Sequence, residues 1–287
     1  MNTIDCPTGG SENPTDAICR ALARVRRNTP LIHHITNYVT VNDCANAVIA
    51  LGGSPVMADD AGEVEEMVSM ASALVLNIGT LNARTVQSMM LAGRKANDLR
   101  IPIVLDPVGA GATSLRTRTA HQLVDALHPV VIRGNMSEIK SLAGLDVRTR
   151  GVDSTAGLED AETVAQSLSE KLECVIAITG RMDFVAFKKR ICVIRNGHEM
   201  LSQITGAGCM TTSLVGTCLG AVKDPWVAAA AGIVCMGVAG EMAHEQLQSH
   251  EGPGTFKARL LDCIFRLAPE ILKASARIEF SGDLLGV

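Results

Sequence analysis

Aromatic side chains are scarce in this chain, since phenylalanine, tyrosine and tryptophan together make up 2% of its 287 residues. The formal net charge is -4, and no long run of lysine or arginine occurs in the sequence. Proteins that bind nucleic acids usually present a basic surface, and many of them stack bases on aromatic rings. Both deficits therefore argue against a nucleic-acid partner.

Long apolar segments are also missing. The most apolar stretch runs from Trp226 to Gly240, and it falls short of the roughly 20 apolar residues that a membrane-spanning helix needs. We interpret it as a buried helix and expect no membrane partner. The N-terminus, MNTIDCPTGGSENPTD, has neither the basic nor the apolar region of a secretory signal. We predict that residues 1–20 form a flexible tail and that residues 21–287 form a single domain.

The nine cysteines form neither a CxxC pair nor a Cys/His cluster with zinc spacing. An odd number of cysteines, dispersed along a chain without an export signal, is typical of reduced thiols, which predicts a cytoplasmic protein. Most of these cysteines are expected to be small buried hydrophobic residues. Cys209 is the exception, for a reason given below.

The order of short apolar runs and helical patterns indicates the fold class. Strands are expected at Leu31–Ile35, Ser54–Val56, Ala73–Asn77, Ile103–Asp106, Val130–Arg133, Val175–Thr179 and Phe184–Lys188, with a hairpin partner at Arg190–Asn196. Helical patterns lie between them near Val39–Leu51, Val64–Met70, Arg84–Asn97, Arg116–Leu127, Ser137–Ala143 and Glu159–Leu172. This alternation predicts an α/β fold with a mostly parallel sheet covered on both faces. After Gly208 the pattern is helical to the end, over Cys209–Leu219, Pro225–Gln248 and Thr255–Ser275.

A glycine-rich turn, TGAGC at residues 205–209, stands directly before one of these helical patterns. The backbone N–H groups of Gly206, Ala207 and Gly208, together with the positive end of the following helix, are suited to bind a phosphate. Taken alone, the segment is equally an ordinary turn into a helix. It is not a P-loop, because no GxxxxGK[ST] motif exists in the chain. It is not a dinucleotide fingerprint either, because that motif follows an early strand.

Charged side chains follow two of the predicted strands. Asp106 ends an apolar run at the position where open α/β sheets bind their ligands, and a carboxylate there suits magnesium. In isolation, a loop cap before Pro107 explains this residue nearly as well. Arg133 and Glu138 stand just past the next strand, where they could hold phosphate oxygens and a magnesium ion or its waters. Ser137 could simply cap the helix that follows.

Two further strand ends carry polar side chains. Thr179 offers a hydroxyl, and Gly180 after it leaves room for a nucleotide. Asn37, in the segment HHITNY, can bond a substrate hydroxyl or a ring nitrogen. The preceding His33 and His34 are better interpreted as structural residues than as bases. Because the carboxyl ends of parallel strands meet at one edge of a sheet, all these candidates are expected to converge on the anion-binding turn.

These residues, in this order, closely resemble the hydroxyethylthiazole kinase family, the thiazole-salvage kinases of thiamine biosynthesis. The matching stretches are HHITNYVTVNDCANAVIALGGSPVMADD (33–60), LDPVGAGAT (105–113), RGNMSEI (133–139), AITG (177–180) and ITGAGCMTTS (204–213). The resemblance implies a ribokinase-like three-layer α/β/α fold. It implies transfer of the γ-phosphate of ATP, assisted by Mg²⁺, to the hydroxyl of 4-methyl-5-(2-hydroxyethyl)thiazole. It also implies a homotrimer with the thiazole bound between neighbouring subunits.

Carried over residue by residue, the resemblance implies binding roles. Met57 and Gly206 match thiazole-binding positions, and Asn37 matches a residue that reaches the substrate. Arg133 and Thr179 match ATP-binding positions. All of these positions carry the residue types that the family pattern requires.

The resemblance also implies the catalytic roles. Asp106 and Glu138 match the acidic residues near magnesium, and Cys209 stands where most ribokinase-like kinases carry an aspartate base. We expect the helix start to lower the pKa of the Cys209 thiol, although a thiol remains a poor substitute for a carboxylate and turnover should be slow. A kinase for a pyrimidine alcohol or pyridoxal is the nearest alternative, and it would carry Asp at this position. A ligand-binding regulator would lack the acidic pair, and a lyase or epimerase has no positive support.

Overall fold

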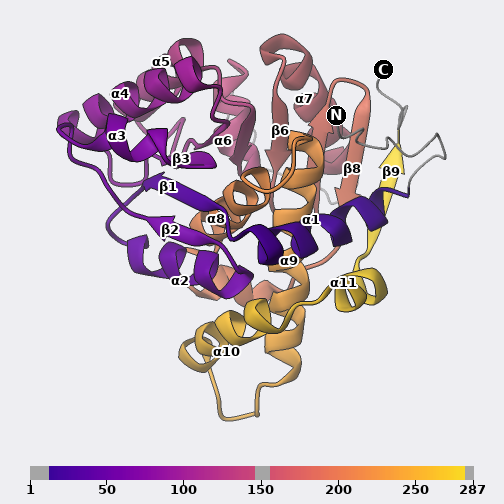
Figure 1. Cartoon of the computed structure of the whole chain (residues 1–287). Helices are drawn as coiled ribbons and strands as arrows, with labels where there is room; N and C mark the ends of the chain where they lie inside the picture. Colours follow the sequence, from indigo (N-terminus) through magenta and orange to yellow (C-terminus); the bar gives the residue numbers. More distant parts are fainter. Residues whose placement is uncertain (1–12, 146–155, 282–287) are drawn as a thin grey trace, which may run out of the picture.

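The computed structural model describes residues 13–145 and 156–281 (Figure 1). In this part of the chain, nine strands form one sheet in the order β2-β1-β3-β4-β5-β6-β7-β8-β9. They are β1 (Leu31–Ile35), β2 (Ser54–Val56), β3 (Ala73–Asn77), β4 (Ile103–Asp106), β5 (Val131–Gly134), β6 (Val175–Ile178), β7 (Asp183–Phe187), β8 (Arg190–Ile194) and β9 (Ile278–Ser281). The strands from β2 to β6 pair in parallel, and β7, β8 and β9 add an antiparallel edge. The prediction of a mostly parallel sheet is confirmed.

Helices cover both faces of this sheet. They are α1 (Pro14–Asn28), α2 (Val41–Leu51), α3 (Val64–Ser69), α4 (Ala83–Leu99), α5 (Ser114–Leu127), α6 (Met136–Leu142), α7 (Ala156–Leu172), α8 (Ala207–Leu219), α9 (Pro225–Glu245), α10 (Pro253–Arg266) and α11 (Pro269–Ser275), with a 3₁₀ turn, η1 (Glu199–Gln203). Side-chain oxygens cap several helix starts: Thr113 accepts from the backbone N–H of Arg116, and Asp224 accepts from that of Trp226. Such caps satisfy N–H groups that the helix cannot pair internally.

The apolar strands supply two separate cores because successive side chains point to opposite faces. Val75 packs into the core formed with α1, α2 and α8 to α11. Its neighbours Leu74 and Leu76 pack into the core formed with α3 to α7. The result is three layers, with the sheet between two layers of helices, as expected from the sequence.

The most apolar helix, α9, lies inside the protein. It is long and apolar enough to cross a membrane by length and composition alone, but 83% of its most apolar window is buried. A Cβ on Gly232 would stand 2.5 Å from the backbone nitrogen of Val215, so this glycine lets α8 and α9 pack backbone to backbone. The interpretation of residues 226–240 as a buried helix is confirmed.

The predicted N-terminal tail of residues 1–20 is too long. Helix α1 begins at Pro14, and Ile18 and Cys19 within it are buried. Asn13 caps this helix by accepting a hydrogen bond from the N–H of Thr15 at 3.0 Å. Residues 1–12 of the predicted tail lie outside the described residues.

The C-terminal region was also predicted incorrectly. The single helix expected over Thr255–Ser275 is two helices, α10 and α11, separated by Ala268 in an extended conformation. Pro269 follows, and proline disfavours the helical conformation in the residue before it. The last strand, β9, was missed because its partly exposed segment IEFS does not form the apolar run that marked the central strands. The other strand boundaries agree with prediction to within two residues.

Candidate active site

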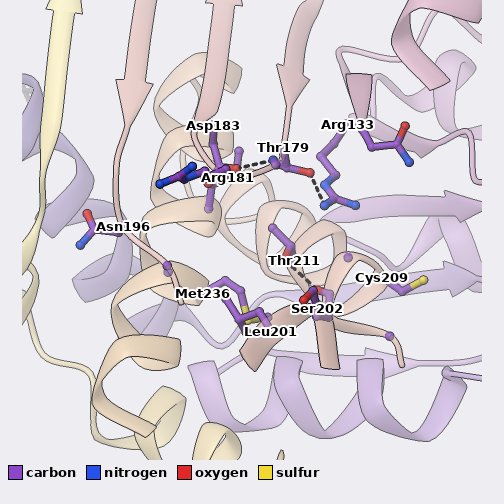
Figure 2. Close-up of a pocket in the computed structure, with 18 of the residues that line it drawn as sticks. Arg133, Thr179, Arg181, Asp183, Asn196, Leu201, Ser202, Cys209, Thr211 and Met236 are labelled. Carbon is purple, nitrogen blue, oxygen red and sulfur yellow. Dashed lines mark hydrogen bonds between the residues drawn. The ribbon is translucent and has the colours of Figure 1, made fainter. Parts of the chain in front are cut away.

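A cleft of about 1030 Å³ lies at the carboxyl ends of the central parallel strands. It is lined by most of the residues that the sequence singled out: Asp106, Arg133, Glu138, Thr179, Gly206, Ala207, Gly208 and Cys209. Figure 2 shows Arg133 and Thr179 near one another, with Cys209 at one end of the cleft and Asn196 and Met236 toward the other. The expected convergence of strand ends on the glycine-rich turn is therefore observed.

Asp106 ends β4 and is buried, with 1% of its surface exposed. Its Oδ2 accepts hydrogen bonds from Asn77 Nδ2 at 2.9 Å and from Thr212 Oγ1 at 2.8 Å. Its Oδ1 is buried and has no hydrogen-bond partner among residues 13–145 and 156–281. Burial raises the pKa of Asp106 to about 6, against the opposing effect of the nearby Arg133. A buried carboxylate with one unpaired oxygen is well suited to receive a cation.

The guanidinium group of Arg133 lies across the start of α8. Its Nη2 donates to Thr179 Oγ1, and its Nη1 lies 3.9 Å from Asp106 Oδ2. A Cβ on Gly208 would stand only 2.8 Å from Nη1, so the close approach of Arg133 requires glycine there. The Nε of Arg133 is buried without a partner. Arg133 therefore presents fixed positive charge where the helix begins.

Within the described part of the chain, no side chain caps the start of α8. Gly206, at the N-cap, has φ 91°, in the left-handed region that favours glycine. A Cβ there would also stand 2.7 Å from Thr40 Cγ2. The first N–H groups of an α-helix have no intrahelical partner, and here they border the cleft. The geometry thus fits the anion-binding turn expected from the sequence.

Glu138 holds two backbone segments together. Asn135, and not Ser137 as suggested by the sequence, caps α6: its side chain accepts from the N–H of Glu138 at 2.9 Å. In return, Glu138 Oε2 accepts from the N–H of Asn135 at 2.8 Å, while Oε1 accepts from the N–H of Gly109 at 2.8 Å. Each carboxylate oxygen keeps a second lone pair, which can accept from a metal-bound water. Glu138 is therefore a structural residue that could also hold the hydration shell of a cation.

Two buried amides face the sulfur of Cys209. Asn37 Nδ2 and Asn77 Nδ2 each lie 3.3 Å from Cys209 Sγ. Burial raises the pKa of the Cys209 thiol, the charge of Asp106 raises it further, and interactions with the side chains of Thr40, Asn37 and Asn77 act against this rise. The expectation of a lowered pKa is wrong, because burial and the charge of Asp106 both raise it. Cys209 is a thiol poised to accept hydrogen bonds.

The remaining predicted residues lie outside the cleft lining. Met57 directly follows β2, the strand at the parallel edge of the sheet. His33 Nε2 lies 2.8 Å from the carbonyl oxygen of Ala58, and His34 Nδ1 lies 3.1 Å from that of Ile32. Burial lowers the pKa of both histidines, that of His34 to about 4. Both are neutral buried residues, which agrees with the structural interpretation.

Sequence reasoning missed two polar residues of the site. Asn77 ends β3 and pairs in register with Asp106, so its position at a strand end was a usable signal. Asp183 begins β7, one residue before the predicted strand, and its Oδ1 accepts from the N–H of Gly180 at 2.9 Å. Burial raises the pKa of Asp183 to about 7. No sequence motif distinguishes this aspartate from an ordinary turn residue.

Three apolar side chains line the cleft away from Cys209. Ile233 and Met236 of α9 line it together with Leu201 of η1. Asn196 borders this end, and its Nδ2 donates to the carbonyl oxygen of Ser275 at 2.9 Å. An apolar space beside an anion-binding turn can accommodate a flat organic group attached to phosphates.

A fully protein-built metal cage is not found in the described ranges, where no three His, Cys, Asp or Glu side chains are grouped for one ion. Mg²⁺ usually keeps several waters and takes only one or two protein carboxylates in phosphate-transfer sites. The unpaired Oδ1 of Asp106, with Glu138 nearby, fits this mode of binding.

The chain has a ribokinase-like α/β fold. A ribokinase-like superfamily protein from Enterococcus faecalis covers 89% of this chain with a TM-score of 0.59 and 12% identity. A pyridoxal kinase from Staphylococcus aureus, solved in complex with AMP-PCP and pyridoxal, covers 88% with a TM-score of 0.60 and 13% identity. At such low identity these two structures share the fold alone with this chain.

Closer relatives identify the family. The sequence profile of the hydroxyethylthiazole kinase family matches residues 22–270. A hydroxyethylthiazole kinase from Alkaliphilus oremlandii is 50% identical over 263 residues, which cover 91% of this chain and 97% of that protein. The solved hydroxyethylthiazole kinase protein from Pyrococcus horikoshii is 39% identical, with a TM-score of 0.84 and coverage of 92% of this chain and 98% of that one. The chain belongs to the hydroxyethylthiazole kinase family.

Proposed function

We propose that this chain phosphorylates the hydroxyl of 4-methyl-5-(2-hydroxyethyl)thiazole with ATP, in thiamine salvage. The observation that carries the proposal is that one cleft joins Arg133, Asp106 and the uncapped start of α8 beside Cys209. Phosphoryl transfer requires mainly positioning and neutralisation of charge, and these groups are suited to both. Membership of the hydroxyethylthiazole kinase family supports the substrate.

The nucleotide is held by its phosphates. Arg133 and Thr179 bind ATP, and the N–H groups of the turn at Gly206–Gly208 bind the phosphoryl group that is transferred. These donors are fixed before the reaction, because Arg133 is already bonded to Thr179 and lies against Gly208. Preorganised donors of this kind stabilise the charge that redistributes in the transition state.

Asp106 and Glu138 are the residues that would hold Mg²⁺. Asp106 offers its unpaired Oδ1, and Glu138 offers the free lone pairs of a carboxylate already fixed by two backbone N–H groups. When bound, the ion neutralises charge on the ATP phosphates. A nearby cation also favours the ionised form of Asp106, whose pKa is raised in the protein alone.

Cys209 lies where the substrate hydroxyl must approach the transferred phosphoryl group. Its raised pKa leaves little thiolate near neutral pH, so general-base assistance is weak and slow turnover is expected. A loose transition state needs little removal of the proton before transfer, and it tolerates a weak base.

The thiazole binds between subunits of a homotrimer, at Asn37, Met57 and Gly206. Tyr38 and Val39, which directly follow Asn37, are 77% and 56% exposed in the single chain. Exposed apolar residues beside a binding residue support an interface at this position. The cysteines within the described part are unpaired, which supports a reducing, cytoplasmic setting.

The substrate is tested by measuring ADP release with the thiazole alcohol, a pyrimidine alcohol and pyridoxal side by side. We expect Mg²⁺-dependent release with the thiazole alcohol well above that with both competitors. Equal or better turnover of the pyrimidine alcohol would overturn the assignment. The assembly is tested by light scattering, where a stable, fully active monomer would rule out the trimer.

A further inference from the structure

Asn77 connects the two ends of the candidate active site. It is 2% exposed, it ends β3, and it lies beside Asp106 in the sheet. One hydrogen of its Nδ2 points to Asp106 Oδ2 at 2.9 Å, and Cys209 Sγ lies 3.3 Å from the same nitrogen. Its one carboxamide group therefore touches both the carboxylate and the thiol.

The orientation of this carboxamide is fixed by its surroundings. Asn77 Oδ1 accepts from the backbone N–H of Gly79 at 2.9 Å and from Asn37 Nδ2 at 3.0 Å. A backbone N–H can only donate, so the oxygen of Asn77 must face Gly79 and the nitrogen must face Asp106 and Cys209. All four hydrogen-bonding positions of the group are occupied, and flipping it would break the hydrogen bonds to Gly79, Asn37 and Asp106.

Asn37 is fixed in the same way. Its Oδ1 accepts from the N–H and from the hydroxyl of Thr40, at 3.1 and 3.0 Å. Its Nδ2 is left to face Asn77 Oδ1 and Cys209 Sγ. The sulfur thus receives two N–H groups whose directions cannot reverse, and it must act toward them as an acceptor.

Asn77 also decides which oxygen of Asp106 is free. Asn77 and Thr212 both donate to Oδ2, whereas Oδ1 is buried without a partner. The carboxylate is consequently held in one orientation, with Oδ1 left for a cation. Mutating a residue that fixes the orientation of a metal ligand typically costs about 10–100-fold in metal affinity or activity.

We propose that Asn77 is a positioning residue of this site. One hydrogen of its amide bonds to Asp106 and the other to Cys209, so these two side chains keep a fixed position relative to each other. The distance between Asp106, which would hold the cation, and Cys209, which would accept the proton, is thereby kept constant. The sulfur of Cys209 is kept as a hydrogen-bond acceptor facing the substrate hydroxyl. The catalytic part of this inference rests on the proposed function, while the hydrogen bonds to sulfur do not.

The test uses Asn77→Asp, which keeps the size and the acceptor of Asn77 but replaces both donated hydrogens by an oxygen. Asn77→Ala serves as a second variant in case the added charge prevents folding, and circular dichroism with thermal melting checks both. Thr212→Val is the matched control, because it removes the other donor to Asp106 Oδ2 without a contact to the sulfur.

The first measurement is the rate at which iodoacetamide alkylates Cys209 at one mildly alkaline pH, followed by mass spectrometry of the peptide that contains it. The thiolate is the reactive form, and loss of a hydrogen bond to a charged acceptor should slow alkylation by about tenfold or more in Asn77→Ala. In Asn77→Asp the new carboxylate also disfavours the thiolate and should slow alkylation further. Thr212→Val should stay within about twofold of wild type, because its donor serves Asp106 only. This measurement needs no substrate, so it remains decisive if the thiazole alcohol is not turned over and the proposed function fails.

The second measurement is ADP release in a double-mutant cycle of Asn77→Ala with Cys209→Ala. If Asn77 acts through the sulfur, its effect on kcat shrinks when the sulfur is already absent, and the two single effects do not multiply. A residue needed only for folding would give multiplied effects. Folded Asn77 variants that alkylate at the wild-type rate, or single effects that multiply, would overturn the proposal.

Discussion

Replacing Gly208 with alanine places one methyl group against the guanidinium of Arg133. The new Cβ would stand 2.8 Å from Nη1, 3.4 Å from Nη2 and 3.5 Å from Cζ. Nη1 must therefore retreat, and an ordinary contact of 3.4 Å corresponds to a movement of about 0.6 Å. Arg133 cannot make that movement freely, because Thr179 and Asp106 hold its two terminal nitrogens.

The expected cost falls on activity and not on folding. A misplacement of about 1 Å in a catalytic group can reduce the rate by about 10²-fold, so a shift of half that size should reduce kcat/KM for ATP by roughly tenfold. Gly208 lies in the first turn of α8, where alanine is a better helix former by up to about 1 kcal/mol. The melting temperature of Gly208→Ala should therefore be unchanged or higher.

The assay is ADP release over a range of ATP concentrations, with thermal melting of the same samples. Gly254→Ala is the matched control: it lies in the first turn of α10, and its Cβ would meet no atom within 4 Å. It should keep wild-type kcat/KM. A folded Gly208→Ala enzyme with wild-type kinetics for ATP would refute the placement of Arg133 against the helix start.

Three further predictions follow from the same site. Cys209→Asp should fold and keep or increase turnover by at most about 10²-fold, because the two amide N–H groups that face Cys209 can donate to the new carboxylate. Cys209→Ala should fold and turn over more slowly. A folded but inactive Cys209→Asp, together with a fully active Cys209→Ala, would contradict this prediction in the ADP-release assay. Replacing Asp106 or Glu138 with alanine should lower kcat more than it weakens thiazole binding, and unchanged turnover of both variants at saturating Mg²⁺ would show that the pair is structural. Burial raises the pKa of Asp183 from 3.8 to about 7, so the folded protein binds this proton more tightly than the unfolded chain, and stability should fall as pH rises through this range. Asp183→Asn keeps an acceptor for Gly180 and should lack that part of the dependence, and equal pH slopes of the two melting temperatures would count against it.

The parallel half of the fold could be predicted from sequence because its signals are local. The strands at Leu31–Ile35, Ala73–Asn77 and Ile103–Asp106 agree with the prediction at both ends, since each is an apolar run between polar turns. The strand β9 depends instead on a partner, β8, that lies far away in the sequence. Its segment IEFS alternates apolar and polar residues, but four partly exposed residues at a sheet edge do not form the apolar run that marked the central strands.

The sequence predicted most of the residues that form the site, but not the pKa of Cys209. Asp106, Arg133 and Thr179 stand at strand ends, and the topology of a parallel sheet brings such positions together. The pKa of Cys209 depends on how deeply it is buried and on which carboxylate lies near it, and neither is visible in the order of residues. Asn77 was overlooked because an amide at a strand end carries no motif, although its place in the register is what gives it two catalytic neighbours.

The late position of β9 in the chain has a consequence for synthesis on the ribosome. The N–H of Arg277, just before β9, donates to Asn196 Oδ1 at 2.7 Å, and the two residues are 81 positions apart. At about 5–20 residues per second, β8 emerges roughly 4–16 s before the strand that covers its edge. During that interval the nascent chain presents an unpaired strand edge, which is a template for pairing with a neighbouring chain. Translation speed through α8, α9 and α10 therefore sets how long each new molecule is exposed to misassembly.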